Sequence, residues 1–371
     1  MKIVIDARMY GAQSTTGIGA YIKNLTDQLF LIDQKNEYVL LMKEPAYSEF
    51  IVPNLRIKKI KVDIPWYSLS EQIKLPWILL RQKADLVHFP HFNASIFYPK
   101  KFIVTIHDIT PKFFPGPLAK KRLIRKWGYD FIFKTTLKRA DKIIAISEHT
   151  KKNLIDNFSV NKDKIITTYL GVSPEFMVPK SEKEILDLKT KYKITKPFIF
   201  YVGVWRDHKN LPGLIFAFDE LKNHYQLDCQ LVLGGKQDFR YPEISQAIKN
   251  SKHRSDIILP GFIAENELIA FYQAAKLFVL PSFCEGFGLV ALEAMALGTP
   301  VAGSNTTSLP EILQDAAIYF NPKDHLAMAK VFNQILTDKN LYQDLKTRGL
   351  EQVKKYNWTN CASQTLNIYQ S

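Results

Sequence analysis

The sequence predicts an α/β protein built from two doubly wound, parallel-sheet domains. Short apolar, β-branched runs alternate with helical segments at residues 3–5, 38–42, 86–89, 102–106 and 143–146. The alternation begins again in the second half, at residues 198–202, 231–233, 257–259, 278–280, 301–302 and 318–320. Such a pattern is typical of parallel sheets covered by helices. A chain of 371 residues, of which 46% are hydrophobic, can fill two such cores.

The boundary between the two domains is predicted just after residues 170–174, where the first series of strands ends. We assign residues 1–178 to an N-terminal domain and residues 179–355 to a C-terminal domain. The last segment, 356–371, has the pattern of a terminal helix, and its Trp358 could pack elsewhere than on the second domain.

The composition argues against several classes of protein. No apolar run has the length of a membrane-spanning helix, and residues 1–6 read as a first strand rather than a secretory signal, so we expect a cytosolic protein. Cys229, Cys284 and Cys361 are widely separated and lack C-x-x-C spacing, which argues against a disulfide framework or a zinc site. The net charge of +14 comes mostly from the first half of the chain.

Residues 277–300 contain the most informative motif. The apolar run 277–280 leads into Pro281-Ser282, which is typical of a buried strand that ends in a turn. Residues 289–297 are rich in helix-forming residues, and Gly298 and Pro300 mark the end of that helix. The helix is therefore predicted to begin near Gly288.

The loop before this helix is predicted to hold a sugar phosphate. Gly286 and Gly288 leave room for a ligand against the backbone, and N–H groups of the first helical turn attract anions. Glu285 lies on the loop and Glu293 lies about one and a half turns inside the helix, so the two carboxylates would address different parts of one extended ligand. The alternative is that Glu285 only complements the helix dipole and that Glu293 is an ordinary solvated residue.

The motif resembles the E-x7-E signature of retaining glycosyltransferases of family 4, which have the GT-B architecture. Other landmarks of the family occur in the expected order along most of the chain. Three precede the glutamates: the glycine loop Thr16-Gly17-Ile18-Gly19, the motif Ile106-His107-Asp108, and the strand and turn of residues 201–211. Asn305, Ser308 and Pro310-Glu311-Ile312 come after the glutamates. The resemblance implies two Rossmann-like domains with an interdomain cleft, a nucleotide-sugar donor, retention of configuration, and a C-terminal helix that crosses back to the first domain.

The resemblance also implies roles for individual residues. Glu285 would bond hydroxyls of the donor hexose and Glu293 would hold the nucleotide ribose. Backbone N–H groups of the loop would contact the diphosphate, from Gly286, Phe287, Gly288 and Leu289. Gly17 and Gly19 would approach the diphosphate from the other domain. Phe262 and Ile263 are candidates to flank the base, with simple loop packing as the alternative.

A departing nucleoside diphosphate must be stabilised electrostatically. The chain contains no Asp-x-Asp triplet of the kind that holds a metal in other glycosyltransferases, so no metal and no other cofactor is expected. Arg206 and Lys209, in the turn after the strand that ends at Gly203, could converge on one anion instead. The alternative is that Arg206 and Lys209 are solvated surface residues with no ligand. His208 departs from the family pattern, which often has Arg or Pro before the Lys-Asn pair.

Two histidine motifs follow predicted strands of the first domain. His107 and Asp108 come at a strand's carboxyl end, where α/β proteins bind ligands, and could orient the sugar or an acceptor hydroxyl. A metal site is disfavoured because no metal-ligand spacing unites these histidines with the others. His88 and His91 follow another strand, and either an acceptor-side or a structural role fits them.

The segment between Lys112 and Lys142 combines a strong excess of basic residues with interleaved aromatic residues. This composition favours docking on an anionic membrane surface, with a patch formed by Lys120, Lys121, Arg122, Arg125 and Lys126. The alternative is a solvated helix face over an aromatic core. Nucleic-acid binding is disfavoured because no recognition motif accompanies the charge.

Together these features predict a cytoplasmic hexosyltransferase, peripheral at the inner face of the membrane. It would move mannose from GDP-mannose onto a lipid-linked or cell-surface glycan such as that of lipopolysaccharide. Because no carboxylate is marked as a covalent nucleophile, we favour front-face substitution, in which the departing phosphate helps to take the acceptor proton. The alternatives are a UDP-sugar or dTDP-sugar donor, a nucleotide-sugar epimerase, and a non-catalytic nucleotide-sugar-binding or membrane-scaffold protein.

Overall fold

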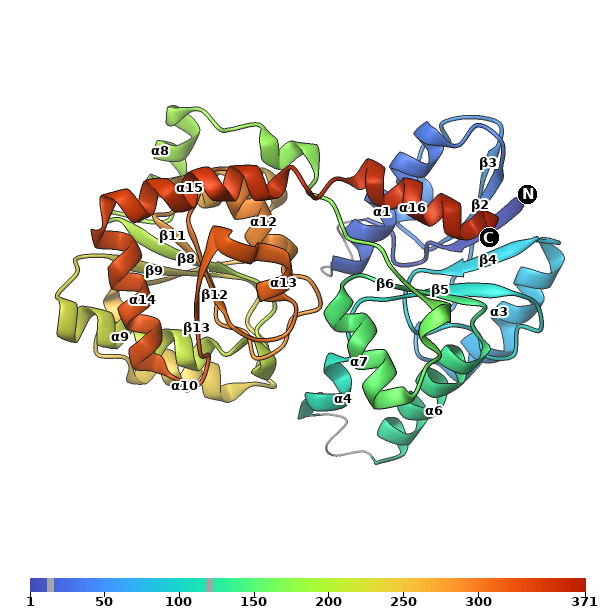
Figure 1. Ribbon diagram of the computed structural model, residues 1–371, viewed down its shortest axis with the longest axis horizontal. Coiled ribbons are helices and arrows are strands. Elements are labelled where there is room, and N and C mark those ends of the chain that lie inside the picture. The colour runs from blue at the N-terminus through green and yellow to red at the C-terminus, as the bar shows by residue number, and fades with distance from the viewer. Residues whose placement is uncertain (12–16, 118–122) are drawn as a thin grey trace. The chain divides into compact units, whose positions relative to one another are not determined.

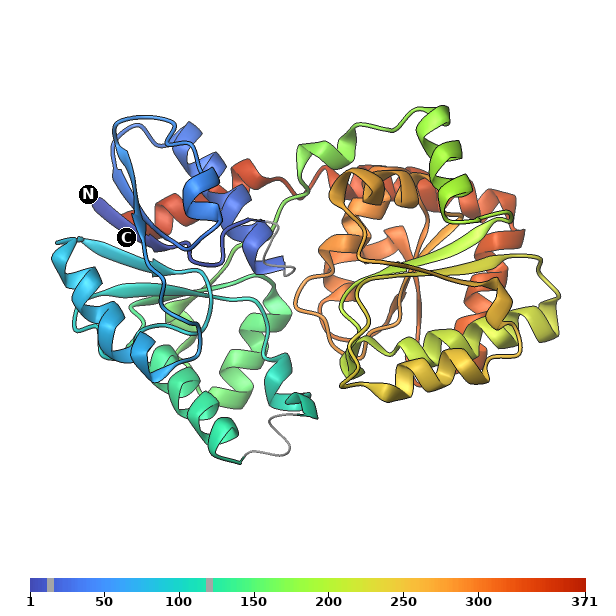
Figure 2. The ribbon, with the colours of Figure 1, turned by 180° about the vertical axis from the view of Figure 1, so that it is seen from behind.

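The computed structural model describes residues 1–11, 17–117 and 123–371 (Figure 1). The chain forms two compact units. The first comprises Met1–Ile109, Ala119–Gly171 and Trp358–Ser371, and the second comprises Thr110–Leu118 and Val172–Asn357. Each unit is a parallel β-sheet with helices packed on both faces (Figures 1 and 2). The predicted architecture of two doubly wound α/β domains is therefore confirmed.

The first unit contains, within the described residues, a seven-stranded parallel sheet of order β3-β2-β1-β4-β5-β6-β7. The order reverses between β1 and β4, where Ile3 pairs with Leu86. The strands are β1 (Lys2–Asp6), β2 (Glu37–Met42), β3 (Ile57–Lys61), β4 (Leu86–Phe89), β5 (Phe102–Ile106), β6 (Lys142–Ala145) and β7 (Ile165–Thr167). The edge strands β3 and β7 were not expected from the sequence.

Helices of the first unit pack on both faces of its sheet. They are α1 (Gly17–Ile32), α2 (Ala46–Glu49), α3 (Leu69–Arg81), α6 (Leu123–Arg139), α7 (Glu148–Phe158) and α16 (Trp358–Gln370). Buried side chains of α3, α6 and α7 share one core with β1, β4 and β5. The C-terminal helix α16 packs against α1, where the Tyr21 and Trp358 rings lie 6.0 Å apart and the Thr359 hydroxyl donates to Gln28.

The second unit contains, among the residues that the structure describes, a six-stranded parallel sheet of order β10-β9-β8-β11-β12-β13. The order reverses between β8 and β11, where Ile199 pairs with Leu277. The strands are β8 (Phe198–Val202), β9 (Gln230–Gly234), β10 (Ile257–Gly261), β11 (Leu277–Leu280), β12 (Val301–Ser304) and β13 (Ala317–Phe320). All six match apolar runs that the sequence marks as strands.

One face of this sheet packs on α9, α10, α14 and α15, whose buried residues form a single core with β8 and β9. On the other face, Phe271 and Tyr272 of α11 lie against Phe200 of β8. The helices of the second unit are α4 (Thr110–Phe113), α8 (Glu182–Lys191), α9 (Leu211–Tyr225), α10 (Pro242–Asn250), α11 (Glu265–Ala274), α12 (Leu289–Ala296), α13 (Leu309–Leu313), α14 (His325–Thr337) and α15 (Lys339–Val353).

Candidate active site

In the second unit, a glycine lies at the carboxyl end of each of three neighbouring strands. The carboxyl ends of parallel strands form the edge of the sheet where ligands usually bind. Gly203 follows β8, Gly235 follows β9, and Gly261 ends β10. The Gly235 N–H donates to the Gly261 carbonyl at 2.8 Å. A Cβ on Gly235, whose φ is +120°, would lie 2.0 Å from the Gly203 carbonyl oxygen. Only glycine permits this close approach of the two turns.

Lys209 and Glu285 meet at this edge, although they are far apart in the sequence. Lys209 ends a short 3-10 helix, η3 (Asp207–Lys209), and its Nζ lies 2.8 and 2.9 Å from the two carboxylate oxygens of Glu285. The Ser282 hydroxyl donates to the same carboxylate at 2.6 Å. The Lys209 and Glu285 side chains are only 17% and 11% exposed. The structure thus brings two of the predicted catalytic residues together.

The pKa of Glu285 lies below its ordinary value. Burial by itself raises the pKa, but the ammonium of Lys209 and the hydrogen bonds from Lys209 and Ser282 outweigh it. The backbone of Glu285 is fixed as well, because its N–H donates to the Thr307 hydroxyl at 3.0 Å and its carbonyl accepts from the Ser308 hydroxyl at 3.0 Å. Glu285 is therefore held ionised and in one position.

Glu293 lies on α12 and is buried, so the expectation that it could be an ordinary solvated helix residue is wrong. The Tyr272 hydroxyl, from α11, donates to Glu293 at 2.9 Å. Burial raises the pKa of Glu293 to about 7, against the effect of the Tyr272 hydrogen bond. Close to neutral pH, Glu293 can therefore donate as well as accept a hydrogen bond.

We expect Glu293→Gln to remove a pH dependence of stability. The pKa of Glu293 rises from 4.5 to about 7 on folding, so its favourable contribution is fully present below pH 4.5 and is lost as the pH rises to about 7. The shift corresponds to about 3 kcal/mol. Relative to wild type, the variant should gain about that much in free energy of unfolding between pH 4.5 and 8, measured by urea denaturation. A constant difference across this range would contradict the assignment, and Tyr272→Phe should move the titration to higher pH.

Arg206 and Lys209 do not share a partner among the described residues. Arg206 is exposed, and it helps Arg240 to lower the pKa of Asp238. Lys209 is committed to Glu285 in this structure. Convergence of both cations on one phosphate remains a prediction.

His208, which departs from the family pattern, is buried and forms part of the loop scaffold. Its carbonyl accepts a hydrogen bond from the Phe283 N–H at 2.8 Å, which ties η3 to the loop before Glu285. Asn210 also holds this region, since its Nδ2 donates to the carbonyls of Pro281 at 3.1 Å and Pro322 at 2.7 Å. The sequence analysis includes Asn210 only as part of the Lys-Asn pair and assigns it no role, although its position before a Leu-Pro helix start was an available signal.

The loop ahead of α12 has the predicted boundaries. Gly288, at φ +91°, caps the helix, and a Cβ there would lie 2.5 Å from a Leu309 methyl carbon. Leu289 is the first residue of α12, and Gly298 follows its end at φ +74°. Phe287 is buried and its ring lies edge-on to Tyr356, at 5.7 Å between centroids. Phe287 therefore anchors the loop, and its backbone contact with a diphosphate stays a prediction.

The two residues proposed to flank the base differ in environment. Ile263 is buried and its side chain packs closely over Gly234 of β9. A Cβ added to Gly234 would lie only 2.7 Å from Ile263 Cδ1. Phe262 is 61% exposed. The environment of Ile263 is that of simple loop packing. The exposed ring of Phe262 is accessible to a ligand, so its contact with the base stays a prediction.

Predicted residues of the first unit lie around the carboxyl ends of β4 and β5. His107 donates from Nε2 to the Pro90 carbonyl at 2.9 Å, and burial lowers its pKa despite that bond and the nearby Asp108. The Tyr67 hydroxyl and His91 Nε2 are 2.7 Å apart. Asp108 is half-buried beside His107.

His88 has a structural environment rather than an acceptor-facing one. It is fully buried, and its ring nitrogens lie 2.7 Å from the Tyr369 hydroxyl and 2.8 Å from the Thr105 hydroxyl. It therefore joins α16 to the sheet. Gly17 and Gly19 lie in the first turn of α1, and their neighbour Thr16 is outside the described residues.

The predicted membrane patch lies mostly outside the part of the chain that the structure describes. Lys120, Lys121 and Arg122 lie outside the described residues, and the side chains of Arg125 and Lys126 are not described either. Within the described parts of the chain, no helix is long and apolar enough to cross a membrane. The same parts contain no group of three or more His, Cys, Asp or Glu side chains that could hold a metal ion.

Comparisons with known proteins agree with this architecture. Residues 17–176 match the family described as Glycosyltransferase Family 4, and residues 183–352 match Glycosyl transferases group 1. The chain is 31% identical over 308 residues to the O-antigen chain mannosyltransferase B of Escherichia coli, covering 82% of this chain and 78% of that protein. It is 34% identical over 270 residues to the E. coli serotype-specific mannosyltransferase WbdA, covering 71% of this chain but only 32% of WbdA.

Among solved structures, sucrose-phosphate synthase from Thermosynechococcus elongatus superposes with a TM-score of 0.80 at 22% identity, over 100% of this chain and 98% of that one. WaaG, a glycosyltransferase involved in lipopolysaccharide biosynthesis, superposes with a TM-score of 0.74 at 14% identity, over 99% of each chain. These two likenesses support the fold, and the sequence relatives support the activity class. The chain belongs to glycosyltransferase family 4, in a group that includes O-antigen mannosyltransferases, and it is a GT-B glycosyltransferase.

Proposed function

We propose that this glycosyltransferase transfers mannose from GDP-mannose onto a lipid-linked or cell-surface glycan, with retention of configuration and without a metal ion. The observation that carries the proposal is the buried Lys209–Glu285 pair at the glycine-rich edge of the second unit. The choice of mannose follows the names of the E. coli relatives.

Charge on the diphosphate grows as the glycosidic bond breaks, so the transition state needs fixed positive partners. In the proposal, Lys209, Arg206 and backbone N–H groups at the start of α12 supply them. Glu285, held ionised, accepts hydrogen bonds from hydroxyls of the donor hexose, and Glu293 accepts from or donates to the ribose. The departing phosphate oxygen takes the acceptor proton in a front-face substitution.

A transfer assay with a panel of nucleotide sugars tests the proposal. Purified protein is incubated with GDP-mannose, UDP-glucose, UDP-N-acetylglucosamine or dTDP-rhamnose, together with mannose-terminated glycolipid acceptors, with and without EDTA. We expect GDP-mannose to give an α-linked product in both conditions. Transfer from a different donor supports the alternative donors, and a converted nucleotide sugar without acceptor supports an epimerase. Inhibition by EDTA or an inverted product would contradict the proposed mechanism.

Contact with an anionic membrane is part of the proposal, and one face of α6 supports it. Trp127 and Phe131 are 75% and 63% exposed, and Lys134 and Lys138 are exposed as well. Their spacing of four, three and four residues aligns them in one stripe along the helix. Aromatic rings beside lysines suit the interface of an anionic bilayer.

Lys134→Glu/Lys138→Glu is expected to weaken binding to phosphatidylglycerol vesicles at least about tenfold, because each lysine near an anionic surface contributes about 1 kcal/mol. Sedimentation with vesicles measures the effect. The matched control is Lys330→Glu/Lys339→Glu, which makes the same charge change at exposed helical positions of the second unit. An equal loss in the control would mean that net charge, rather than the α6 stripe, governs binding.

A further inference from the structure

A short segment that precedes α6 in the chain packs on the turns of the candidate active site. Residues 110–117, which contain α4, belong to the second unit, although the residues before and after them along the chain belong to the first. We call residues 110–117 the α4 segment. Its contacts join it to the turn that carries Lys209 and to the loop that carries Glu285.

Phe114 is the centre of this packing and is half-buried. Its ring is parallel to that of Phe283, with an angle of 5° between the planes and 6.3 Å between the centroids. The same ring lies 5.9 Å from the ring of His208. Both distances are in the range of favourable aromatic pairs. The Phe283 N–H donates to the His208 carbonyl at 2.8 Å, so Phe114 lies on the point where the two turns meet.

Two further contacts hold the α4 segment in place. Thr110 Oγ1 and Cys284 Sγ are 3.3 Å apart, and Cys284 is 9% exposed. A Cβ added to Gly116, whose φ is +71°, would lie 3.2 Å from the Tyr241 hydroxyl. The backbone at Gly116 therefore runs close to the connection between β9 and α10.

The residues that the α4 segment contacts are chain neighbours of the ion pair. His208 comes directly before Lys209, and Cys284 comes directly before Glu285. The ion pair has its short distances of 2.8 and 2.9 Å only while the two turns keep their separation. Because a shift of about 1 Å at a reacting group can lower a rate about 10²-fold, a ring that packs on both turns matters for catalysis.

We infer that Phe114 is a positioning residue, which holds the turns of Lys209 and Glu285 together through His208 and Phe283. The inference rests on the proposed function, because that function assigns the chemistry to Lys209 and Glu285. It adds a residue that acts through the two turns. The sequence analysis assigns no role to Phe114, since it interprets the basic, aromatic stretch that begins at Lys112 as a membrane surface.

Phe114→Ala should lower kcat at least about tenfold, because the turns lose the ring that fixes their separation. The KM for the donor should change less than about twofold, since the proposed ribose and diphosphate contacts are on α12. Phe114→Tyr keeps the ring and should restore kcat to nearly the wild-type value. Steady-state kinetics measure all three effects, and an unchanged kcat in Phe114→Ala would overturn the inference.

The matched control is Phe113→Ala, which removes the neighbouring ring of α4. Phe113 is 52% exposed, and its ring lies 5.9 Å from the Lys112 ammonium. Among the described ring contacts, none joins Phe113 to either turn. We expect wild-type kcat in this variant. An equal loss in Phe113→Ala and Phe114→Ala would show that any change in α4 has the same effect, and Phe114 would have no special role.

The thiol of Cys284 reports the position of the α4 segment without any transfer reaction. Cys229, Cys284 and Cys361 are all free and buried, and peptide mass spectrometry can tell them apart after labelling with a thiol reagent. Cys284 should react at least about tenfold faster in Phe114→Ala than in wild type, because local opening becomes easier. Phe113→Ala should label at the wild-type rate. An unchanged rate in Phe114→Ala would contradict the inference.

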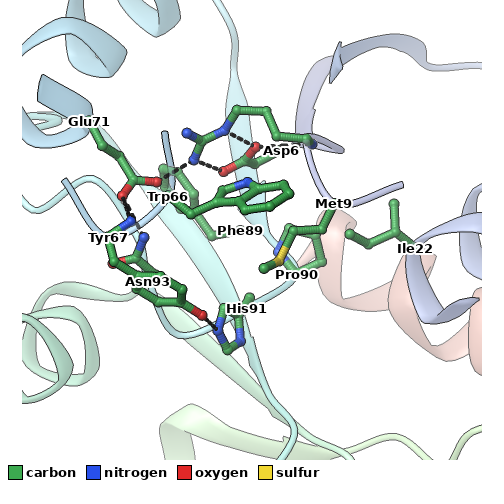
Figure 3. A pocket seen from close by; sticks show the side chains of 11 residues that line it. Asp6, Met9, Ile22, Trp66, Tyr67, Glu71, Phe89, Pro90, His91 and Asn93 are labelled. Atoms are coloured by element: carbon green, nitrogen blue, oxygen red, sulfur yellow. Dashed lines mark hydrogen bonds and ion pairs between the residues drawn. The ribbon is translucent and has the colours of Figure 1, made fainter. Parts of the chain in front are cut away.

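A second control lies in the first unit. The Tyr67 hydroxyl and His91 Nε2 are 2.7 Å apart, and Figure 3 shows this hydrogen bond. Tyr67→Phe removes it and should leave the labelling rate of Cys284 unchanged. Faster labelling in this variant as well would mean that any loosening of the protein exposes Cys284, which would remove the support from Phe114→Ala.

The two measurements separate this inference from the proposed function. Faster labelling of Cys284 with a wild-type kcat would show that Phe114 covers the loop without positioning it, which overturns the inference alone. If wild-type protein transfers sugar from none of the donors, the proposed function fails. The labelling rates then still test whether Phe114 holds the loop of Glu285.

Discussion

Lys209→Met is expected to lower kcat by about 10²–10³ and to destabilise the second unit by about 3 kcal/mol. The activity loss has the size expected when a preorganised charge partner of the transition state is removed. The stability loss arises because the Glu285 carboxylate, only 11% exposed, would lose its ammonium partner and keep the Ser282 hydroxyl. The sequence does not predict this ion pair, because Lys209 and Glu285 are far apart in the chain. Steady-state kinetics and urea denaturation measure the two effects.

The double variant Lys209→Met/Glu285→Gln separates catalysis from structural support. It replaces the ion pair by two neutral side chains of similar size, so most of the lost stability should return. Activity should remain at least as low as in Lys209→Met, because Glu285 is also proposed to bind the donor hexose. If the double variant regained both stability and activity, the pair would be purely structural and the proposed active site would be wrong.

Gly235→Ala is expected to destabilise the protein by at least about 3 kcal/mol, which is large for a single methyl group. The new Cβ would lie 2.0 Å from the Gly203 carbonyl oxygen, which is backbone and cannot move aside as a side chain could. The turn after β8 would have to shift, and η3 with Lys209 follows that turn directly. Activity should therefore fall together with stability, as measured by thermal unfolding and the transfer assay.

Gly261→Ala is the matched control for this prediction. Gly261 also has a positive φ, +77°, but a Cβ there would meet no atom within 4 Å. Its cost should be limited to the backbone conformation, about 1–2 kcal/mol. Equal effects of the two substitutions would show that backbone conformation, and not the close approach of Gly235 to Gly203, accounts for the loss.

The local features of the candidate site could be predicted from the sequence because they depend on neighbouring residues. The strand β11, the cap at Gly288 and the end of α12 before Gly298 follow from apolar runs, helix propensity and the conformational freedom of glycine. The position of Glu285 on the loop and of Glu293 inside the helix follows from the same boundaries. The burial of Glu293 does not, since it depends on α11 and Tyr272 packing over it.

The sequence by itself determined the class of fold, the six strands of the second unit, the family and the motif that contains both glutamates. Only the tertiary structure decided the edge strands β3 and β7 of the first unit and the ion pair between Lys209 and Glu285. The edge strands β3 and β7 each have a single neighbour, and β3 carries three lysines in five residues, so neither shows the continuous apolar run of a central strand. Lys209 and Glu285 meet only because parallel strands bring distant segments to one edge of a sheet. The spacing of the residues along the chain does not predict such a contact.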